Sequence, residues 1–309
     1  MPSESHKERH LSPSPLSAAL VTNNDGTPRG TPPPLDDKLI VLFDIDNTLC
    51  AFSIYPNGEA RADEWRNVLL VADSKEAGIA ELMKDKIRAY FRKLGLTEEE
   101  AAHLHHEYYK TYGLAIRGLV RHHKVDPLDY DKHCDQALPL ETVLKVDPRL
   151  QQLLRDIDRE KCHVWALTNA YVNHAVRVLK LLGISEFFEG IVSCDYGAGD
   201  FSCKPEAEFF QESVEAVSSP PPPLSRLYFV DDSALNIRGA NALGWGHCVL
   251  FDEAGAEENR LGGLDKMPLD EDKEGPAKEA ARVSVISDLE ELRHVWREVF
   301  KAPPTNGSS

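Results

Sequence analysis

Two aspartates separated by one residue follow a short apolar run. The run Leu39–Phe43 has strand length, and Asp44 and Asp46 come after it. Alternate side chains of an extended chain point the same way, so both carboxylates can face one site. The first can attack a phosphorus centre and help bind a cation, and the second can protonate a leaving oxygen and then accept a proton from water. Taken alone, such a pair more often caps a turn or a helix.

Further polar residues follow other apolar runs. Thr168 and Asn169 follow the second run, Lys204 lies in the loop after the third, and Asp231 and Asp232 follow the fourth. These runs are residues 163–167, 191–193 and 227–230. A hydroxyl, an amide and helix N-terminal N–H groups at 168–169 can cradle an anion. In open parallel sheets ligands bind outside the carboxyl ends of the strands, so we expect all four groups to share one site.

The elements that position these groups alternate along the chain. The apolar runs, with a further one at His247–Phe251, are separated mostly by helical stretches, and Val283–Ile286 is a possible edge strand. Continuous apolar strands that alternate with helices indicate a parallel sheet covered on both faces. The sequence therefore predicts an α/β protein with a Rossmann-like parallel sheet core.

One long segment and two tails interrupt this alternation. The segment after the first strand has no convincing strand and predicts helices near 76–94, 97–121 and 127–136. Inserted at that point, it is expected to form a helical cap over the carboxyl end of the sheet. The Ser- and Pro-rich N-terminus predicts disorder, and the acidic stretch 265–280 predicts a surface loop. The expected division is a tail at 1–37, a core at 38–52 and 145–301, a cap at 53–144 and a tail at 302–309.

Composition narrows the class of partner and the compartment. The formal net charge of −16 disfavours a nucleic-acid polymer or an anionic membrane as partner. An acidic protein that handles phosphate must also bring positive charge to its site locally. The six cysteines are scattered without a CxxC pair, and no signal-peptide core or membrane-length apolar run is present. We expect reduced thiols and a protein of the cytoplasm, with the nucleus as a second compartment, that acts on a small-molecule substrate; the sequence identifies no protein partner.

Four segments together resemble the four motifs of haloacid-dehalogenase-like (HAD-like) phosphatases. They are DIDNT at 44–48, LTNA at 167–170, CKPE at 203–206 and VDDS at 230–233. Within that superfamily the chain is more similar to the pyrimidine 5'-nucleotidase branch. The segments that carry this similarity are DIDNTL at 44–49, YYKTYGLAIRGLV at 108–120, LTNAYVNHAVRVLKLLGI at 167–184 and FVDDSALNIRGA at 229–240. The resemblance spans residues 38 to 255.

The resemblance implies a role for each matching residue. Asp44 would be phosphorylated, Asp46 would be the general acid/base, and Lys204 would neutralise charge beside Asp44. Thr168 and Asn169 would hold the phosphoryl oxygens. The implied Mg²⁺ ligands are Asp44, the backbone carbonyl of Asp46, Asp232, and Asp231 directly or through water. His174, close after the second motif, is a candidate for a supporting role.

The second aspartate favours a phosphatase over a dehalogenase. Dehalogenation has no alkoxide leaving group to protonate and needs no magnesium, so it would not require Asp46 or the pair Asp231 and Asp232. The expected activity is Mg²⁺-dependent hydrolysis of pyrimidine nucleoside 5'-monophosphates, UMP and CMP. One alternative is a phosphatase for a sugar phosphate, lysophosphatidate or another metabolite. Another is a non-catalytic regulatory protein that kept the fold.

Substrate recognition is expected from the cap. Tyr108, Tyr112 and Arg117 can stack on a base and contact its edge or the sugar. The alternative is that the tyrosines pack the cap's own helices. The sequence departs from the branch at Cys50, after the first motif, and in a long connection at 53–77, which could change which phosphomonoester fits.

Overall fold

The computed structural model describes residues 19–50, 79–252 and 283–302 of the 309-residue chain. The predictions for the first 18 residues, the connection at 53–77, the acidic loop at 265–280 and the tail from residue 303 fall outside these ranges. Among the described residues no helix is both long and apolar enough to cross a bilayer.

The centre of the molecule is a seven-stranded sheet in the order β1-β4-β3-β2-β5-β6-β7. The strands are β1 (Ala19–Thr22), β2 (Leu39–Phe43), β3 (Cys162–Leu167), β4 (Gly190–Cys194), β5 (Leu227–Asp231), β6 (His247–Phe251) and β7 (Ser284–Ile286). All neighbouring strands are parallel except β1 and β4. The predicted α/β class is confirmed, and β7 is the edge strand expected at 283–286. The strand order reverses beside β2, which places a ligand site at its carboxyl end.

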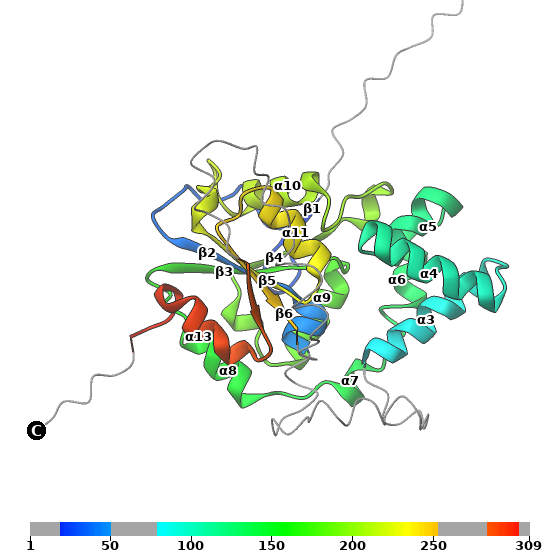
Figure 1. Cartoon of the computed structure of the whole chain (residues 1–309), viewed down its shortest axis with the longest axis horizontal. Coiled ribbons are helices and arrows are strands. Elements are labelled where there is room, and N and C mark those ends of the chain that lie inside the picture. Colours follow the sequence, from blue (N-terminus) through cyan, green and yellow to red (C-terminus); the bar gives the residue numbers. More distant parts are fainter. Residues whose placement is uncertain (1–18, 51–78, 253–282, 303–309) are drawn as a thin grey trace, which may run out of the picture.

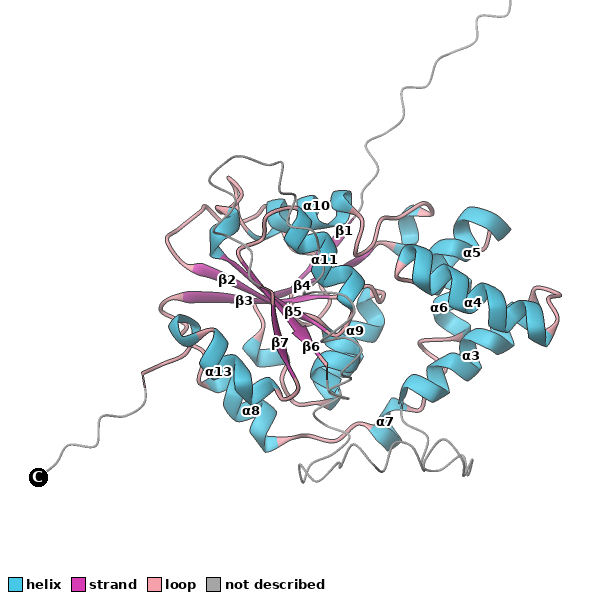
Figure 2. Ribbon diagram, viewed as in Figure 1, coloured by secondary structure: helices cyan, strands magenta, loops and turns pink. Residues whose placement is uncertain are grey.

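Helices cover both faces of the sheet (Figures 1 and 2). Successive residues of β2 point to opposite faces, and the last four are buried: Val41 and Phe43 on one side, Ile40 and Leu42 on the other. The first face packs on α8 (Pro148–Arg155), α9 (Val172–Leu181) and α13 (Leu292–Val295), and the second on α10 (Ala207–Val217) and α11 (Ala234–Ala242).

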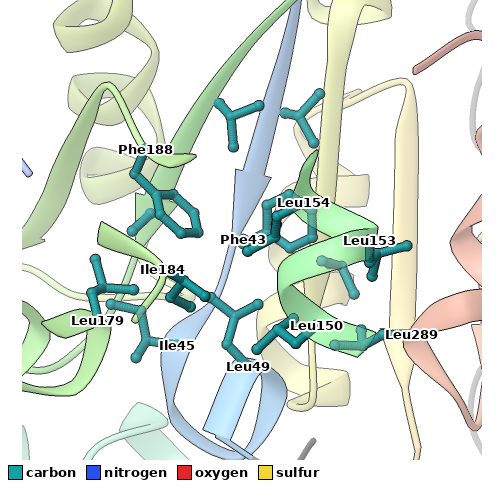
Figure 3. Packing of buried hydrophobic residues seen from close by; sticks show 14 of the residues in the cluster. Phe43, Ile45, Leu49, Leu150, Leu153, Leu154, Leu179, Ile184, Phe188 and Leu289 are labelled. Carbon is teal, nitrogen blue, oxygen red and sulfur yellow. The ribbon is translucent and has the colours of Figure 1, made fainter. Parts of the chain in front are cut away.

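Figure 3 shows how β2 is anchored in the first of these two cores. Phe43, the last residue of the strand, has no exposed surface and meets the ring of Phe188 edge-on, with centroids 6.2 Å apart. Ile45 and Leu49, on either side of Asp46, are also fully buried. Each such side chain contributes about 1.5–3 kcal/mol on burial. The turn that carries the two aspartates is therefore held by apolar anchors on both sides.

The cap consists of helices grouped beside the sheet (Figure 1). They are α3 (Ile79–Lys93), α4 (Glu98–Tyr112), α5 (Ala115–His123) and α6 (Pro127–His133), and α7 (Leu140–Val143) leads back to the core. Thr97 and Glu100 form a capping box at the start of α4. The single helix predicted at 97–121 is wrong, because Gly113 adopts a left-handed conformation with φ of +73° and ends α4.

The predicted N-terminal tail extends too far. Residues 19–37 are ordered, and β1 pairs with the edge of β4. Arg29 lies with its guanidinium carbon 4.5 Å from the centroid of the Trp165 ring and donates a hydrogen bond to the carbonyl of Glu189. Without β1, the edge of β4 would expose unpaired backbone N–H and C=O groups, and a short apolar segment can pair with them. The strand is only four residues long and lies next to polar residues, so the sequence pattern does not predict it.

Candidate active site

The two aspartates lie at the start of the turn that follows β2. Asp44 and Asp46 are extended, whereas Asn47 has φ of 57° and reverses the chain. Asparagine tolerates this left-handed conformation better than most residues. The hydroxyl of Thr48 donates a hydrogen bond of 2.9 Å to Oδ2 of Asp44. Asp44 is thereby fixed at the end of the strand, and only 5% of its surface is exposed.

Lys204 is a buried cation that joins three strands. Its ammonium Nζ donates to Oδ1 of Asp44, Oδ2 of Asp231 and the carbonyl oxygen of Leu167, each at 2.7 Å. These partners lie at the ends of β2, β5 and β3. Lys204 has no exposed surface, and a buried charge is tolerated only when it is paired in this way. The structure thus brings together residues that are 160 and 27 positions apart.

Three carboxylates crowd beside this lysine. One oxygen from each of Asp44, Asp231 and Asp232 lies within 4.8 Å of the other two. Burial, with a contribution from the charge of Asp231 and against the opposing charge of Lys204, raises the pKa of Asp44 to about 7. Burial, followed by the charge of Asp231, also raises the pKa of Asp232 well above its ordinary value. A bound cation would relieve this repulsion.

Asp231 and Asp232 have different surroundings. Asp231 is fully buried and accepts hydrogen bonds from Nζ of Lys204, from the backbone N–H of Ser233 at 2.8 Å and from the amide of Asn236 at 3.0 Å. Asp232 is only partly buried. The geometry therefore makes Asp231 an anchor for the lysine and leaves Asp232 more open to a cation. Asn236 lies one turn into α11 and was missed in the sequence, where nothing but its place after VDDS marks it.

The second motif holds the lysine as well as facing the site. The side chain of Asn169 donates to the carbonyl of Lys204 at 2.9 Å and accepts from its backbone N–H at 2.8 Å. Its amide is therefore occupied with the backbone of Lys204. Thr168 is buried, and its hydroxyl oxygen accepts from the N–H of Ala170 at 3.0 Å, which leaves its hydroxyl proton to donate.

Asp46 turns toward α9. Its Oδ1 lies 2.8 Å from Nε2 of His174, whose side chain is 1% exposed, whereas 37% of the Asp46 side chain is exposed. Burial alone would raise the pKa of Asp46, but the charge and hydrogen bond of His174 outweigh it and hold that pKa below its ordinary value. Burial likewise opposes protonation of His174, yet Asp46 outweighs it and raises the pKa of His174 to about 9.

The structure gives the three predicted substrate residues of the cap partners within the protein. Tyr108 is buried against α5, stacks on the ring of His122 at 5.4 Å and shares a hydrogen bond of 2.9 Å with His123. The hydroxyl of Tyr112 shares one of 2.8 Å with His122. Arg117 is buried and forms ion pairs with Asp200 and Glu206, which join the cap to the core. Their contact with a substrate stays a prediction.

Tyr109 is a cap tyrosine whose pKa is affected by the carboxylate cluster. Half of its surface is exposed. Burial of the hydroxyl, followed by the charges of Asp232 and Asp231, raises its pKa above the ordinary value. One turn further along α4, a Cβ on Gly113 would lie 3.0 Å from the carbonyl oxygen of Lys204. Residues four apart lie on the same side of a helix. The glycine at position 113, which allows this close approach, was the feature of the sequence that indicated that Tyr109 faces the core.

Residues 39–244 match the sequence model of the family described as haloacid dehalogenase-like hydrolases. This match covers more than half of the chain, and the chain belongs to that family. The chain is thus a HAD-like hydrolase, and its parallel sheet core agrees with that assignment.

Individual proteins are also similar to this chain. Phosphate metabolism protein 8 of Saccharomyces cerevisiae is 29% identical over 283 residues, which cover 88% of this chain and 79% of that protein. The Bacillus subtilis HAD-hydrolase YfnB, solved bound to magnesium, is 18% identical with a TM-score of 0.45, over 84% of this chain and 99% of that one. The L-2-haloacid dehalogenase of Xanthobacter autotrophicus is 12% identical with a TM-score of 0.44, over 84% and 98%. These two structural likenesses concern the fold alone.

Proposed function

We propose that this protein is a phosphomonoesterase that acts through an aspartyl-phosphate on Asp44. We further propose that its preferred substrates are the pyrimidine nucleoside 5'-monophosphates UMP and CMP. The observation that carries the chemistry is the ammonium of Lys204 fixed between Asp44 and Asp231, with Asp232 beside them. This arrangement supplies a nucleophile, a fixed positive charge and a set of hard oxygen ligands in one place.

The carboxylate cluster fits a divalent cation such as Mg²⁺. Hard cations prefer carboxylate and carbonyl oxygens, and three carboxylate oxygens already lie within 4.8 Å of one another. Asp44, Asp232 and the backbone carbonyl of Asp46 would hold the ion, with Asp231 directly or through water. When bound, it would neutralise charge on the phosphoryl oxygens.

The protein's own groups account for the first half of the reaction. An oxygen of Asp44 attacks the phosphorus atom, while Lys204 stays hydrogen-bonded to that carboxylate and keeps it oriented. Because the charge of the transition state lies on the phosphoryl oxygens, fixed donors accelerate the step by positioning and electrostatics. The hydroxyl of Thr168 and the backbone N–H of Asn169 would donate to those oxygens, and the side chain of Asn169 holds Lys204 in place.

Asp46 would carry the protons in both halves. It would protonate the ester oxygen as the nucleoside leaves and then take a proton from the water that hydrolyses the aspartyl-phosphate. Its partly exposed carboxylate suits this exchange better than the buried Asp44 does. The need for such a group distinguishes a phosphatase from the dehalogenases that share the fold.

The preference for UMP and CMP draws support from the segments at 108–120, 167–184 and 229–240, which resemble the pyrimidine 5'-nucleotidase branch. Tyr109 adds a half-exposed ring on the cap, and aromatic rings of this kind stack on bases. We therefore add Tyr109 to the predicted specificity residues Tyr108, Tyr112 and Arg117.

A panel of phosphomonoesters tests the proposal. Phosphate release would be measured from nucleoside monophosphates, sugar phosphates and lysophosphatidate, with Mg²⁺ or EDTA, for the wild type and Asp44→Asn. Mg²⁺-dependent release from UMP and CMP that the variant loses is the expected result. Release confined to another phosphomonoester would keep the mechanism and overturn the substrate. Absence of Mg²⁺-dependent release from every compound would favour a regulatory protein without turnover.

A further inference from the structure

His174 lies on α9, within the first turn after the phosphate-facing loop at 168–170. Its side chain is almost fully buried, and Nε2 lies 2.8 Å from Oδ1 of Asp46. Among the described residues, His174 is the one side chain that forms a hydrogen bond with the Asp46 carboxylate. A helix of the core, rather than the cap, therefore holds the carboxylate by one of its two oxygens.

Two further buried acids act on the imidazole of His174. Nδ1 of His174 is buried and has no hydrogen-bond partner among the described groups. The charges of Asp135 and Asp131, buried residues in and just after α6, act on the same ring. The amide of Gln136 donates to Oδ2 of Asp131 at 2.6 Å. Negative charge thus acts on the imidazole from Asp135 and Asp131 as well as from Asp46, which favours a ring that donates toward Asp46.

The segment that follows α6 is fastened to α9 beside this ring. Arg177, three residues after His174, donates to the carbonyl of Leu138 at 2.8 Å and to Oε1 of Glu141 at 2.8 Å. Residues three apart on a helix lie on the same face. His174 therefore occupies a place that is held from both the core and the connection to the cap.

A general acid needs a fixed carboxylate. A free aspartate side chain rotates among several rotamers, and an error of about 1 Å in a catalytic group can cost about 10²-fold in rate. The Asp46 side chain is 37% exposed, so packing alone does not fix it. The hydrogen bond from His174 engages Oδ1 and leaves Oδ2 to reach the leaving oxygen.

We infer that His174 is a positioning residue that holds Asp46 in the orientation from which it protonates the leaving group. This inference rests on the proposed phosphomonoesterase function. It assigns to the helix after the second motif a task beyond binding phosphate. Loss of His174 then affects the protonation of the leaving group more than the attack by Asp44.

The leaving group provides the test. UMP releases a nucleoside alkoxide that requires a proton, whereas p-nitrophenyl phosphate releases a stable phenolate that does not. The quantity to compare is kcat/KM, because it reports the steps up to departure of the leaving group. The full-length variants His174→Leu and His174→Gln would be measured with both substrates in Mg²⁺, with Asp46→Asn as the benchmark for a lost acid.

We expect His174→Leu to lower kcat/KM for UMP by about 10- to 100-fold, part of the ~10²–10⁴ that general acid catalysis supplies. For p-nitrophenyl phosphate the loss is expected to stay below about threefold. His174→Gln retains an N–H donor near the position of Nε2 and is expected to recover most of the UMP activity. Arg177→Gln is the matched control, because it loosens the same segment without contacting Asp46. It is expected to lower kcat/KM for both substrates by the same factor.

The outcomes separate the inference from the function on which it rests. Equal losses for both substrates in His174→Leu, or failure of His174→Gln to recover UMP activity while folded, would overturn the positioning role. Equal losses of kcat/KM for both substrates in Asp46→Asn would instead overturn the proposed phosphatase mechanism. Residual turnover in Asp44→Asn would overturn it as well. If His174→Leu does not fold, the comparison of His174→Gln with Arg177→Gln decides.

Discussion

The edge of the sheet and the cap face each other but differ in how their side chains are placed. At the sheet edge, Asp44 and Asp231 converge because β2 and β5 are neighbours in a parallel ladder, and Lys204 reaches them from the loop after β4. In the cap, the hydroxyls of Tyr108 and Tyr112 share hydrogen bonds with histidines of α5. Chemistry is thus set by strand ends, whereas substrate contact depends on which side of a helix happens to remain open.

The nucleophile gives the largest expected effect at the sheet edge. Asp44→Asn should lower turnover of UMP by about 10⁴-fold or more, because an amide cannot form the phosphoryl intermediate. The amide oxygen can still accept the hydrogen bond from Lys204, so the fold should persist. Steady-state phosphate release and thermal unfolding check the two parts. Residual turnover within tenfold of the wild type would remove Asp44 from the mechanism.

Replacing the lysine should damage both the site and the fold. Lys204→Met leaves Asp44 and Asp231 buried without their cation, at a cost of about 3–5 kcal/mol in the free energy of unfolding. The rate should fall by about 10²–10³-fold where the variant folds. Urea unfolding and activity measure these effects. Lys110→Met, on the exposed face of α4, is the control; a similar loss in that variant would show that the effect is not specific to the site.

Glycine 118 tests whether Tyr108 is a packing residue. A Cβ at Gly118 would overlap the Tyr108 ring, with 2.1 Å to its Cγ. Gly118→Ala should therefore destabilise the protein by about 1–3 kcal/mol. Gly30→Ala, where no atom lies within 4 Å of the added Cβ, should change stability little. Equal unfolding midpoints for the two variants would contradict the close packing of α4 on α5.

Two neighbouring tyrosines sharpen the comparison within the cap. Tyr109→Ala should lower kcat/KM for UMP by about tenfold through lost stacking, since a base on an aromatic ring gains about 1–3 kcal/mol. Tyr108→Phe keeps the packed ring and should leave kcat/KM nearly unchanged. A larger loss in Tyr108→Phe than in Tyr109→Ala would show that Tyr108 contributes more than Tyr109 to substrate recognition.

Asp135, whose charge acts on His174, should give a pH dependence of the free energy of unfolding. Burial, against the charge of His174, raises the pKa of Asp135 from 3.8 to about 7. Because the folded state keeps the proton that the unfolded chain has lost, this contribution is complete below about pH 4. It falls by about 1 kcal/mol per pH unit until about pH 7.

Chemical unfolding at several pH values, compared with Asp135→Asn, measures this contribution. The variant should lack this part of the slope, while the exposed control Asp37→Asn should keep it. Identical slopes in the wild type and Asp135→Asn would show that Asp135 does not hold its proton in the folded protein.

Strand-end residues could be predicted because periodicity locates strands and parallel topology brings their ends together. The positions of Asp44 and Asp231 followed from this logic, and Lys204 was expected in the loop after the third run. The partners of those residues did not: the amide of Asn169 turns to the backbone of Lys204, and Asn236 reaches back from α11. Tyr109 was missed because the direction of a helical side chain depends on how the cap packs. β1 was missed because its partner is a distant strand edge rather than a local pattern.

The most direct test of the account is to trap the intermediate. The wild-type protein would be mixed with Mg²⁺ and UMP carrying radiolabelled phosphate, quenched with acid within one turnover, and digested for peptide mapping. The account predicts acid-stable, hydroxylamine-sensitive label on the peptide that contains Asp44, and none in Asp44→Asn. Turnover of UMP without label on that peptide, or label that persists in the variant, would contradict Asp44 as the nucleophile.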